Sequence, residues 1–246
     1  MMKRTVLLLV CIVSLCSMLA SAQGDRNKQL ERVQSAAEVL DEIMSAPDSG
    51  VPAEIMESAK CVAVVPSMLK GGFVVGGSYG KGIASCRTEK GWSAPAFFRV
   101  VGGSFGFQIG GQAVDLVMLI MNERGMKNLL SSKFKLGADA SVAAGPVGRL
   151  AEGSTDWKLR AQVLTYSRAR GAFAGVTLNG AVIHQDRDDT YAFYGKVIPY
   201  RTILTGGVEV PDDAHSYVNA LARYSPVRPQ PSAATPAPAQ QSQSGQ

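Results

Sequence analysis

The sequence predicts an α+β protein: a curved, mostly antiparallel β-sheet or barrel-like core, with helices at its N- and C-terminal ends. Apolar residues recur at helical spacing near both ends of the chain, and short apolar runs separated by glycine occupy the middle. The 26 glycines among 246 residues exceed the usual share. Hydrophobic residues make up 46% of the chain and charged residues 18%, which supports a buried core and excludes a wholly disordered protein.

Residues 1–22 are typical of a secretory signal peptide. Two basic residues precede a long apolar run, and small residues then lead to Ala22. We expect cleavage between Ala22 and Gln23, and therefore an exported protein, periplasmic or secreted, that can sit peripherally on a membrane. A retained membrane anchor and a lipidated Cys16 are the alternatives, and the residues around them fit either one poorly.

Removal of this segment lowers the formal net charge from +5 to +3, which gives no sign of a nucleic-acid partner. Two cysteines, Cys61 and Cys86, then remain. Because an exported chain meets an oxidising compartment, we expect one disulfide between them; two buried free thiols are the alternative. The chain has no CxxC spacing, which redox catalysis and structural zinc would normally need.

Helices are expected at both ends of the mature chain. Between residues 25 and 46, apolar residues recur every three or four positions, while acidic and basic residues nearly cancel on the opposite face. A membrane-surface helix is normally basic there, so we expect this helix to pack on its own domain, with a membrane as the alternative. Pro211 opens a final helix that ends near Tyr224. Shorter helices are expected over residues 52–58 and 122–130.

Short apolar runs predict the strands. They cover residues 61–65, 73–75, 82–86, 96–109, 114–121, 133–136, 163–167 and 172–183. The glycine-rich segment 76–82 is expected to be a hairpin turn, since it does not complete the phosphate-loop spacing that Gly80 and Lys81 suggest. In the strand over 96–109, one face is nearly bare glycine. A bare face indicates the close approach of another backbone or, as the alternative, a slot for an acyl chain.

The domain is expected to span residues 25–224. From residue 225 to residue 246, proline, glutamine and serine dominate and one arginine is the only charge, which predicts a disordered tail.

Residues for catalysis are sparse. The chain has two histidines, His184 and His215, and contains neither GxSxG nor HExxH. The polar run 185–189 beside His184 is expected to be a solvated loop. Asp115 and Asp139 lie among apolar or small residues, so we expect backbone amides to bind their carboxylates; a catalytic pair is the alternative. The prediction is therefore no enzyme, no cofactor and no metal, with a two-histidine metal site left open.

A series of motifs resembles one known family. The run from Val65 to Gly77, VPSMLKGGFVVGG, resembles the start of the SYLF domain core. Further segments then follow in the family order: GKG at 80–82, GWSAPAF at 91–97, GFQIG at 106–110, DLV at 115–117, GADA at 137–140, GPVGR at 145–149, YSR at 166–168, Gly171 and FAGV at 173–176. The likeness covers about residues 30–205.

The resemblance implies non-enzymatic binding of anionic phospholipid, with phosphoinositide-like head groups, at a membrane surface. Some relatives also bind actin, but an exported chain would not meet it. A structural or protein-interaction module of the bacterial cell envelope is the second hypothesis, and an unrecognised hydrolase is the third.

Binding of an anionic membrane needs cations beside apolar surface. A net charge of +3 attracts weakly over distance, so local clusters must supply the attraction, at about 1 kcal/mol for each cation near the surface. The lipid-binding candidates are Lys70, Lys81, Lys127, Lys133, Lys135 and Arg149. Three of these, Lys70, Lys81 and Arg149, lie within the motifs that resemble the family.

Overall fold

The structure is a computed structural model that describes residues 25–46, 50–73, 75–105, 110–147, 161–169, 172–173 and 178–226. Three predictions lie outside these ranges. They concern the signal peptide with its cleavage site between Ala22 and Gln23, the lipid-binding candidate Arg149, and the tail from residue 227 onward.

A curled, mostly antiparallel sheet forms the body, as the sequence predicts. Its strand order is β6-β10-β4-β2-β1-β5-β8-β7; the neighbours are antiparallel except for β7 and β8, while β3 pairs with β2 and β9 with β8. The strands are β1 (Cys61–Phe73), β2 (Val75–Thr88), β3 (Gly91–Trp92), β4 (Ala96–Phe105), β5 (Gly110–Ile120), β6 (Lys133–Lys135), β7 (Val142–Ala144), β8 (Val163–Ala169), β9 (Ala172–Phe173) and β10 (Val182–Gln185).

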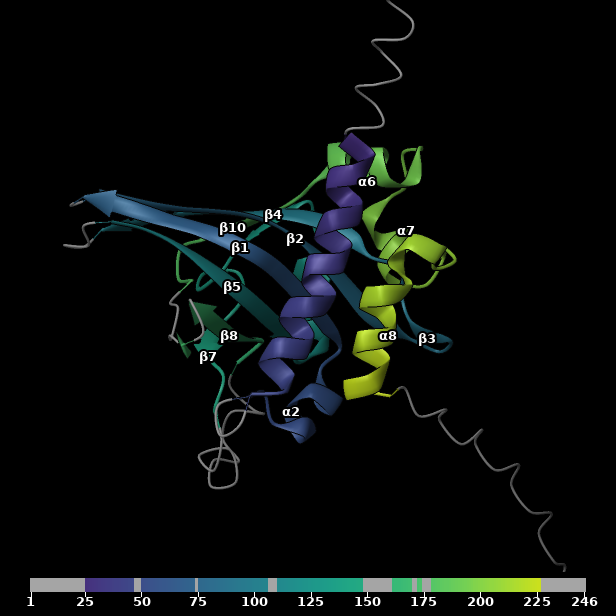
Figure 1. The fold of residues 1–246 in the computed structure, drawn as a ribbon, viewed down its shortest axis with the longest axis horizontal. Coiled ribbons are helices and arrows are strands. Elements are labelled where there is room, and N and C mark those ends of the chain that lie inside the picture. Colours follow the sequence, from purple (N-terminus) through teal and green to yellow (C-terminus); the bar gives the residue numbers. More distant parts are fainter. Residues whose placement is uncertain are drawn as a thin grey trace, which may run out of the picture.

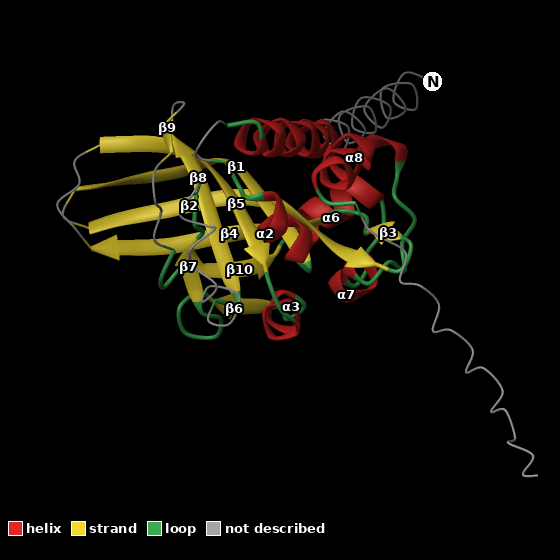
Figure 2. Ribbon diagram, turned by 90° about the horizontal axis from the view of Figure 1, so that it is seen from below, coloured by secondary structure: helices red, strands yellow, loops and turns green. Residues whose placement is uncertain are grey.

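Helices precede, interrupt and follow the strands. They are the N-terminal helix, described over residues 25–44, then α2 (Ala53–Ser58), α3 (Glu123–Leu129), α6 (Arg187–Tyr194), α7 (Tyr200–Leu204), the 3-10 turn Asp212–Ala214 and α8 (His215–Tyr224). Figure 1 shows the N-terminal helix, in purple, crossing the sheet beside α8. In the orthogonal view of Figure 2, β1, β2, β4 and β5 extend well beyond the helices.

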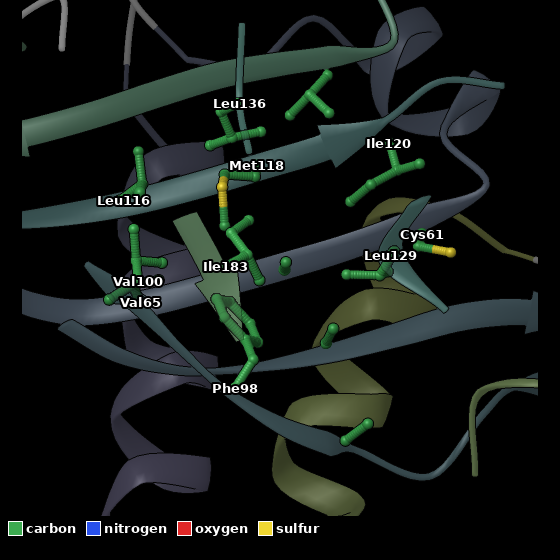
Figure 3. Close-up of a cluster of buried hydrophobic side chains, with 14 of the residues drawn as sticks. Cys61, Val65, Phe98, Val100, Leu116, Met118, Ile120, Leu129, Leu136 and Ile183 are labelled. Carbon is green, nitrogen blue, oxygen red and sulfur yellow. The ribbon is translucent and has the colours of Figure 1, made fainter. Parts of the chain in front are cut away.

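Apolar side chains are buried on both faces of the sheet. Alternate residues of β1 point to opposite sides, so Val62 and Val64 meet the N-terminal helix and α8 on the face that we call outer. Cys61, Ala63 and Val65 point to the inner face, where the curled sheet packs on itself and on α3 and α7. Figure 3 shows Cys61 and Val65 in this core with Phe98. Burial on both sides explains why this strand is a continuous apolar run in the sequence.

The N-terminal helix packs on its own domain. Most of its apolar residues are buried against the outer face, and Val33, Leu40 and Ile43 are fully buried. Ion pairs connect its polar side to the C-terminal helical region, Arg26 with Asp213 and Arg223 with Asp41. The apolar face of this helix is therefore used within the protein.

The two remaining cysteines form the expected disulfide. Cys61 and Cys86 are register partners on β1 and β2, with their Cα atoms 3.9 Å apart, and both are fully buried in the inner core.

Contacts at the C-terminus extend past the expected domain boundary at residue 224, to Ser225 and to the Pro226 carbonyl, which accepts from Arg87. Ser225 is fully buried; its carbonyl accepts from Trp92 Nε1 at 3.0 Å, and its hydroxyl donates to the Met56 carbonyl at 2.9 Å. Ser225 is thus part of the packed body.

The strand expected over residues 172–183 is not continuous, because residues 179 and 180 form a turn before β10 and Gly180 has a φ of 87°.

Two further local predictions were wrong. The segment 76–82, expected as a turn, is part of the continuous strand β2, because its glycines leave room for neighbouring side chains to pack over the strand. The run 185–189, expected as a solvated loop, ends β10 and opens α6, with Asp186 as the N-cap. Asp186 and Asp189 are buried there because cations from other elements pair with them.

Close packing at Gly82 gives a stability prediction. A Cβ at this position would lie 2.7 Å from the Phe98 ring and 2.8 Å from a Val65 methyl group. We expect Gly82→Ala to lower the free energy of unfolding by about 1–3 kcal/mol, since the core must shift to admit the methyl group. Urea denaturation of the oxidised protein measures the change.

The matched control is Gly103→Ala on the neighbouring strand β4. Gly103 is exposed, and a Cβ there meets nothing within 4 Å. Its effect should stay within about 0.5 kcal/mol. Equal losses in the two variants would contradict the packing explanation.

Candidate functional site

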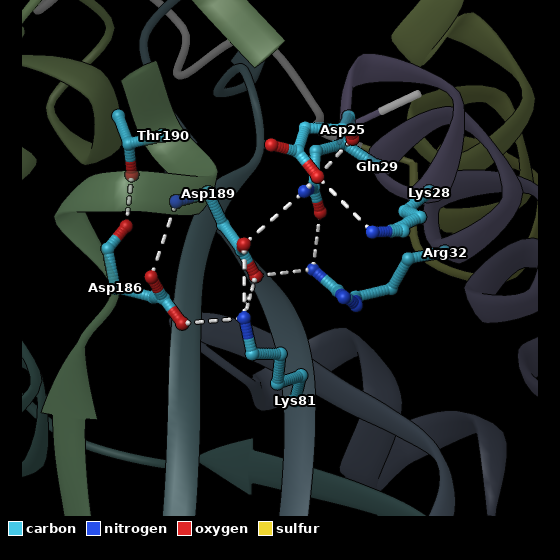
Figure 4. Close-up of polar contacts among 8 residues, drawn as sticks. All are labelled: Asp25, Lys28, Gln29, Arg32, Lys81, Asp186, Asp189 and Thr190. Carbon is cyan, nitrogen blue, oxygen red and sulfur yellow. Dashed lines mark hydrogen bonds and ion pairs between the residues drawn. The ribbon is translucent and has the colours of Figure 1, made fainter. Parts of the chain in front are cut away.

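A buried polar cluster joins the N-terminal helix, β2 and α6 (Figure 4). Lys81 Nζ lies 2.8 and 2.9 Å from the two carboxylate oxygens of Asp189 and 3.2 Å from Asp186 Oδ2. Arg32 donates to Asp189 at 2.6 Å, and Gln29 donates to it at 3.1 Å. Two cations therefore share the Asp189 carboxylate.

Hydrogen bonds and ion pairs together shift the pKa of Lys81 and of Asp186 more than burial does. Burial alone would lower the pKa of Lys81, but its hydrogen bonds and ion pairs with Asp189 and Asp186 raise it above its usual value. Burial alone would raise the pKa of Asp186, but the Asp189 backbone N–H and the Lys81 cation lower it. The charged forms of both groups are thus stabilised in the folded protein.

The lipid-binding candidates occupy different environments. Lys81 is held between two carboxylates in this cluster. Lys70 is half-buried on β1, and burial lowers its pKa. Lys127 is exposed on α3. Lys133 and Lys135 are exposed on either side of the buried Phe134, so the strand expected over residues 133–136 is confirmed and has one cationic face.

Pairing between strands brings basic residues from four segments into one row. Lys81 on β2 is the register partner of Arg99 on β4; Arg99 pairs with His184 on β10, and His184 pairs with Lys133 on β6. We call these four residues the basic row. Arg99 and His184 were not among the sequence candidates, because nothing local to either residue indicates which strand lies beside it.

A row of apolar residues lies next to the basic row. On β2, β4 and β10 it is two residues closer to the end of the sheet that extends beyond the helices. Leu69 on β1 is the register partner of Tyr79 on β2, Tyr79 pairs with Val101 on β4, and Val101 pairs with Val182 on β10. Leu69 is 61% exposed, Tyr79 45% and Val101 41%. We call Leu69, Tyr79, Val101 and Val182 the apolar row. Lys135, the partner of Val182, lies at its end.

Backbone amides bind the two isolated carboxylates, as expected. Asp115 Oδ1 accepts from the Ser67 N–H at 2.9 Å, and Asp139 Oδ2 accepts from the Lys135 N–H at 2.7 Å. Asp139 also places one negative charge near the basic residues of β6.

Two features are absent from the described residues: a cluster of metal ligands and a membrane-spanning helix. No three His, Cys, Asp or Glu side chains gather there as a metal site would require. No helix in the same ranges combines the length and apolar character needed to cross a membrane.

Comparisons with known proteins identify the family. Residues 101–224 match the Ysc84 family model, described as "Las17-binding protein actin regulator". The rat protein "SH3 domain-containing YSC84-like protein 1" is 34% identical over 195 residues, which is 76% of this chain and 57% of the rat protein. "Protein YSC84" of Saccharomyces cerevisiae is 32% identical over 178 residues, 71% of this chain and 38% of the yeast protein.

The chain therefore belongs to the Ysc84/SYLF family, as its motifs indicate. It spans 57% of the length of the rat relative. The human protein of the same name is 33% identical, and the chain spans the same share of it.

The buried cluster gives a pH-dependent prediction. Asp186→Asn keeps an N-cap acceptor for α6 but removes the charge that faces Lys81. At pH 7 we expect a loss of about 1–3 kcal/mol in the free energy of unfolding. Because the folded-state pKa is depressed, the carboxylate stabilises the protein above its ordinary pKa of about 4. That advantage is lost as pH falls through the folded value, so wild type and variant should converge.

Denaturation at pH 7 and at pH 3 measures both differences. Asp188→Asn is the control, because Asp188 is exposed in the first turn of the same helix. It should cost less than about 1 kcal/mol. A gap between wild type and Asp186→Asn that is as wide at pH 3 as at pH 7 would rule out the charge explanation.

Proposed function

We propose that this protein binds anionic phospholipid at a membrane surface and does not catalyse a reaction. The basic row is the observation that carries the proposal. It places Arg99, His184 and Lys133 side by side on three neighbouring strands, with the exposed Lys135 two residues from Lys133.

The spacing of Arg99, Lys133 and Lys135 suits a shared anionic surface. Neighbouring strands lie about 4.8 Å apart, so Arg99 and Lys133, separated by one strand, are roughly 10 Å apart. This is close to one Debye length at physiological salt, so the cations act together on one patch of head groups. Lys81 adds little, because Asp186 and Asp189 neutralise it.

The expected energy is modest. Each cation near an anionic surface contributes about 1 kcal/mol, and Asp139 opposes part of this. Binding should therefore be measurable and sensitive to salt. Family membership supports the proposal, since the motifs resemble those of lipid-binding SYLF domains.

Vesicle co-sedimentation tests the basic residues. The double variant Lys133→Gln/Lys135→Gln should bind vesicles of phosphatidylcholine with phosphatidylglycerol roughly 30-fold more weakly than wild type, from the loss of two contributions of about 1 kcal/mol. Both side chains are exposed, so the fold should persist. Wild-type binding should rise with the phosphatidylglycerol fraction and fall with salt.

The control is Lys90→Gln/Lys196→Gln, which removes two exposed cations and changes the net charge equally. It should bind nearly as wild type does. The proposal fails if the two double variants bind alike, or if wild type binds neutral vesicles equally well at high salt.

A protein-interaction module of the cell envelope is the second candidate. The relatives' names favour it, since the family description and "LAS seventeen-binding protein 3" of yeast both refer to binding of a protein. Cross-linking in cells that recovers one defined partner, together with absence of lipid preference in the vesicle assay, would select this function.

Export is part of the proposal, because it decides which membrane the protein meets. Ala22→Arg should block cleavage and leave the longer chain in the membrane fraction, since signal peptidase requires a small residue before the cut. Ser21→Arg is the control, because the position between the two small residues tolerates other side chains. Mass spectrometry of the wild-type protein should show an N-terminus at Gln23; a wild-type chain that starts at Met1 would contradict export by cleavage.

A further inference from the structure

We propose that the apolar row is the part of this protein that enters the bilayer interface, so that the outer face of the sheet, beyond the helices, lies on the membrane. This inference rests on the proposed function and specifies its contact surface.

The apolar row is a gathered set of exposed side chains. In the described part of the chain, the large hydrophobic residues that are exposed are Leu69, Tyr79, Val101, Tyr191 and Val197. The first three are register neighbours on adjacent strands, and Val182 continues the row. Contiguous exposed apolar side chains beside polar ones are typical of a membrane or protein contact.

The position of the row explains its exposure. The helices cover the outer face over Val64, Ile83 and Phe97, whereas β1, β2, β4 and β5 extend beyond them (Figure 2). On the inner side, the same part of the sheet stays packed, with Met68 and Val100 fully buried. The row is therefore held on a supported sheet.

The positions next to the apolar row, on the side away from the basic row, carry no side chains. Two residues further along the strands, Gly71 pairs with Gly77 and Gly111, and Gly77 pairs with Gly103. All four glycines are exposed. No side chain at these four positions rises above the apolar row, so these positions do not hold a flat surface away from it.

Charge complementarity selects an anionic bilayer as the partner. The basic row lies about 7 Å from the apolar row, two residues back along each strand. Lys135 lies at the end of the apolar row, beside Val182. Apolar side chains can thus enter the interface while the cations remain at phosphate level, which is the usual division in peripheral membrane proteins. Tyr79 suits such a boundary, since its ring is apolar and its hydroxyl is polar.

The sheet can bind without rearrangement, whereas the N-terminal helix cannot. To present its apolar face to a membrane, the helix would have to expose Val33, Leu40 and Ile43 and break the Arg32–Asp189 ion pair. The apolar row is exposed already, so binding through it incurs no such cost.

Depth-dependent quenching tests the inference. Tyr79→Trp and Tyr191→Trp each introduce a tryptophan at an exposed tyrosine, the first on the apolar row and the second on α6. With vesicles of brominated phosphatidylcholine and phosphatidylglycerol, we expect strong quenching of Tyr79→Trp above the wild-type background and none for Tyr191→Trp. The two native tryptophans and the whole N-terminal region are common to all three proteins.

An affinity comparison gives a second measurement. Leu69→Gln should weaken binding to the same vesicles by roughly fivefold to tenfold, through loss of apolar burial. Val197→Gln is the control, since Val197 is 82% exposed but lies outside the row. It should leave the affinity unchanged.

The outcomes separate the two proposals. Salt-sensitive binding to phosphatidylglycerol with no quenching at Tyr79→Trp, or with equal quenching at Tyr191→Trp, overturns the sheet-face inference and leaves the proposed function standing. Absence of any anionic preference overturns both. A wild-type dimer in light scattering that Leu69→Gln converts to a monomer would assign the row to a second copy and also overturn the inference.

Discussion

The long central strands extend beyond the helices that cover them, and this difference in length organises the molecule. The 14 residues of β2 span roughly 46 Å, whereas the described N-terminal helix spans roughly 30 Å and crosses the sheet obliquely (Figure 1). Where the helices lie, both faces of the strands bury apolar side chains. Just beyond the helices, Met68 and Val100 still bury the inner face, but the outer face is open. One strand thus contributes Ile83 to the core and Tyr79 to the surface.

The buried polar cluster fixes where that boundary lies. Removing charges from water is costly, and Lys81, Arg32 and the two carboxylates offset the cost by pairing with one another. Because these groups come from β2, the N-terminal helix and α6, their pairing holds the helix in one position over the sheet. The cluster also divides the basic residues by role, since the Lys81 charge is used within the fold while Lys133 and Lys135 face solvent.

Local patterns predicted much of this structure. Lysine alternates with apolar residues around Phe134, and both lysines are exposed as that alternation indicates. The apolar stripe of the N-terminal helix is its buried face. The helix expected over residues 122–130 is α3, which Asn122 caps by accepting from the Gly125 N–H at 2.9 Å. The same reasoning failed at residues 76–82 and 185–189. Glycines normally favour turns and aspartates normally favour water, and in both segments contacts from distant parts of the chain reversed the local preference.

The sequence by itself determined the fold class, the family and the face on which each side chain of a strand lies, because these depend on residues a few positions apart. Only the tertiary structure decided which strands are neighbours. Lys81, Arg99, His184 and Lys133 come from four separate segments, and no local period relates them. Their alignment follows from packing of the whole sheet, which sets the register between strands far apart in the chain.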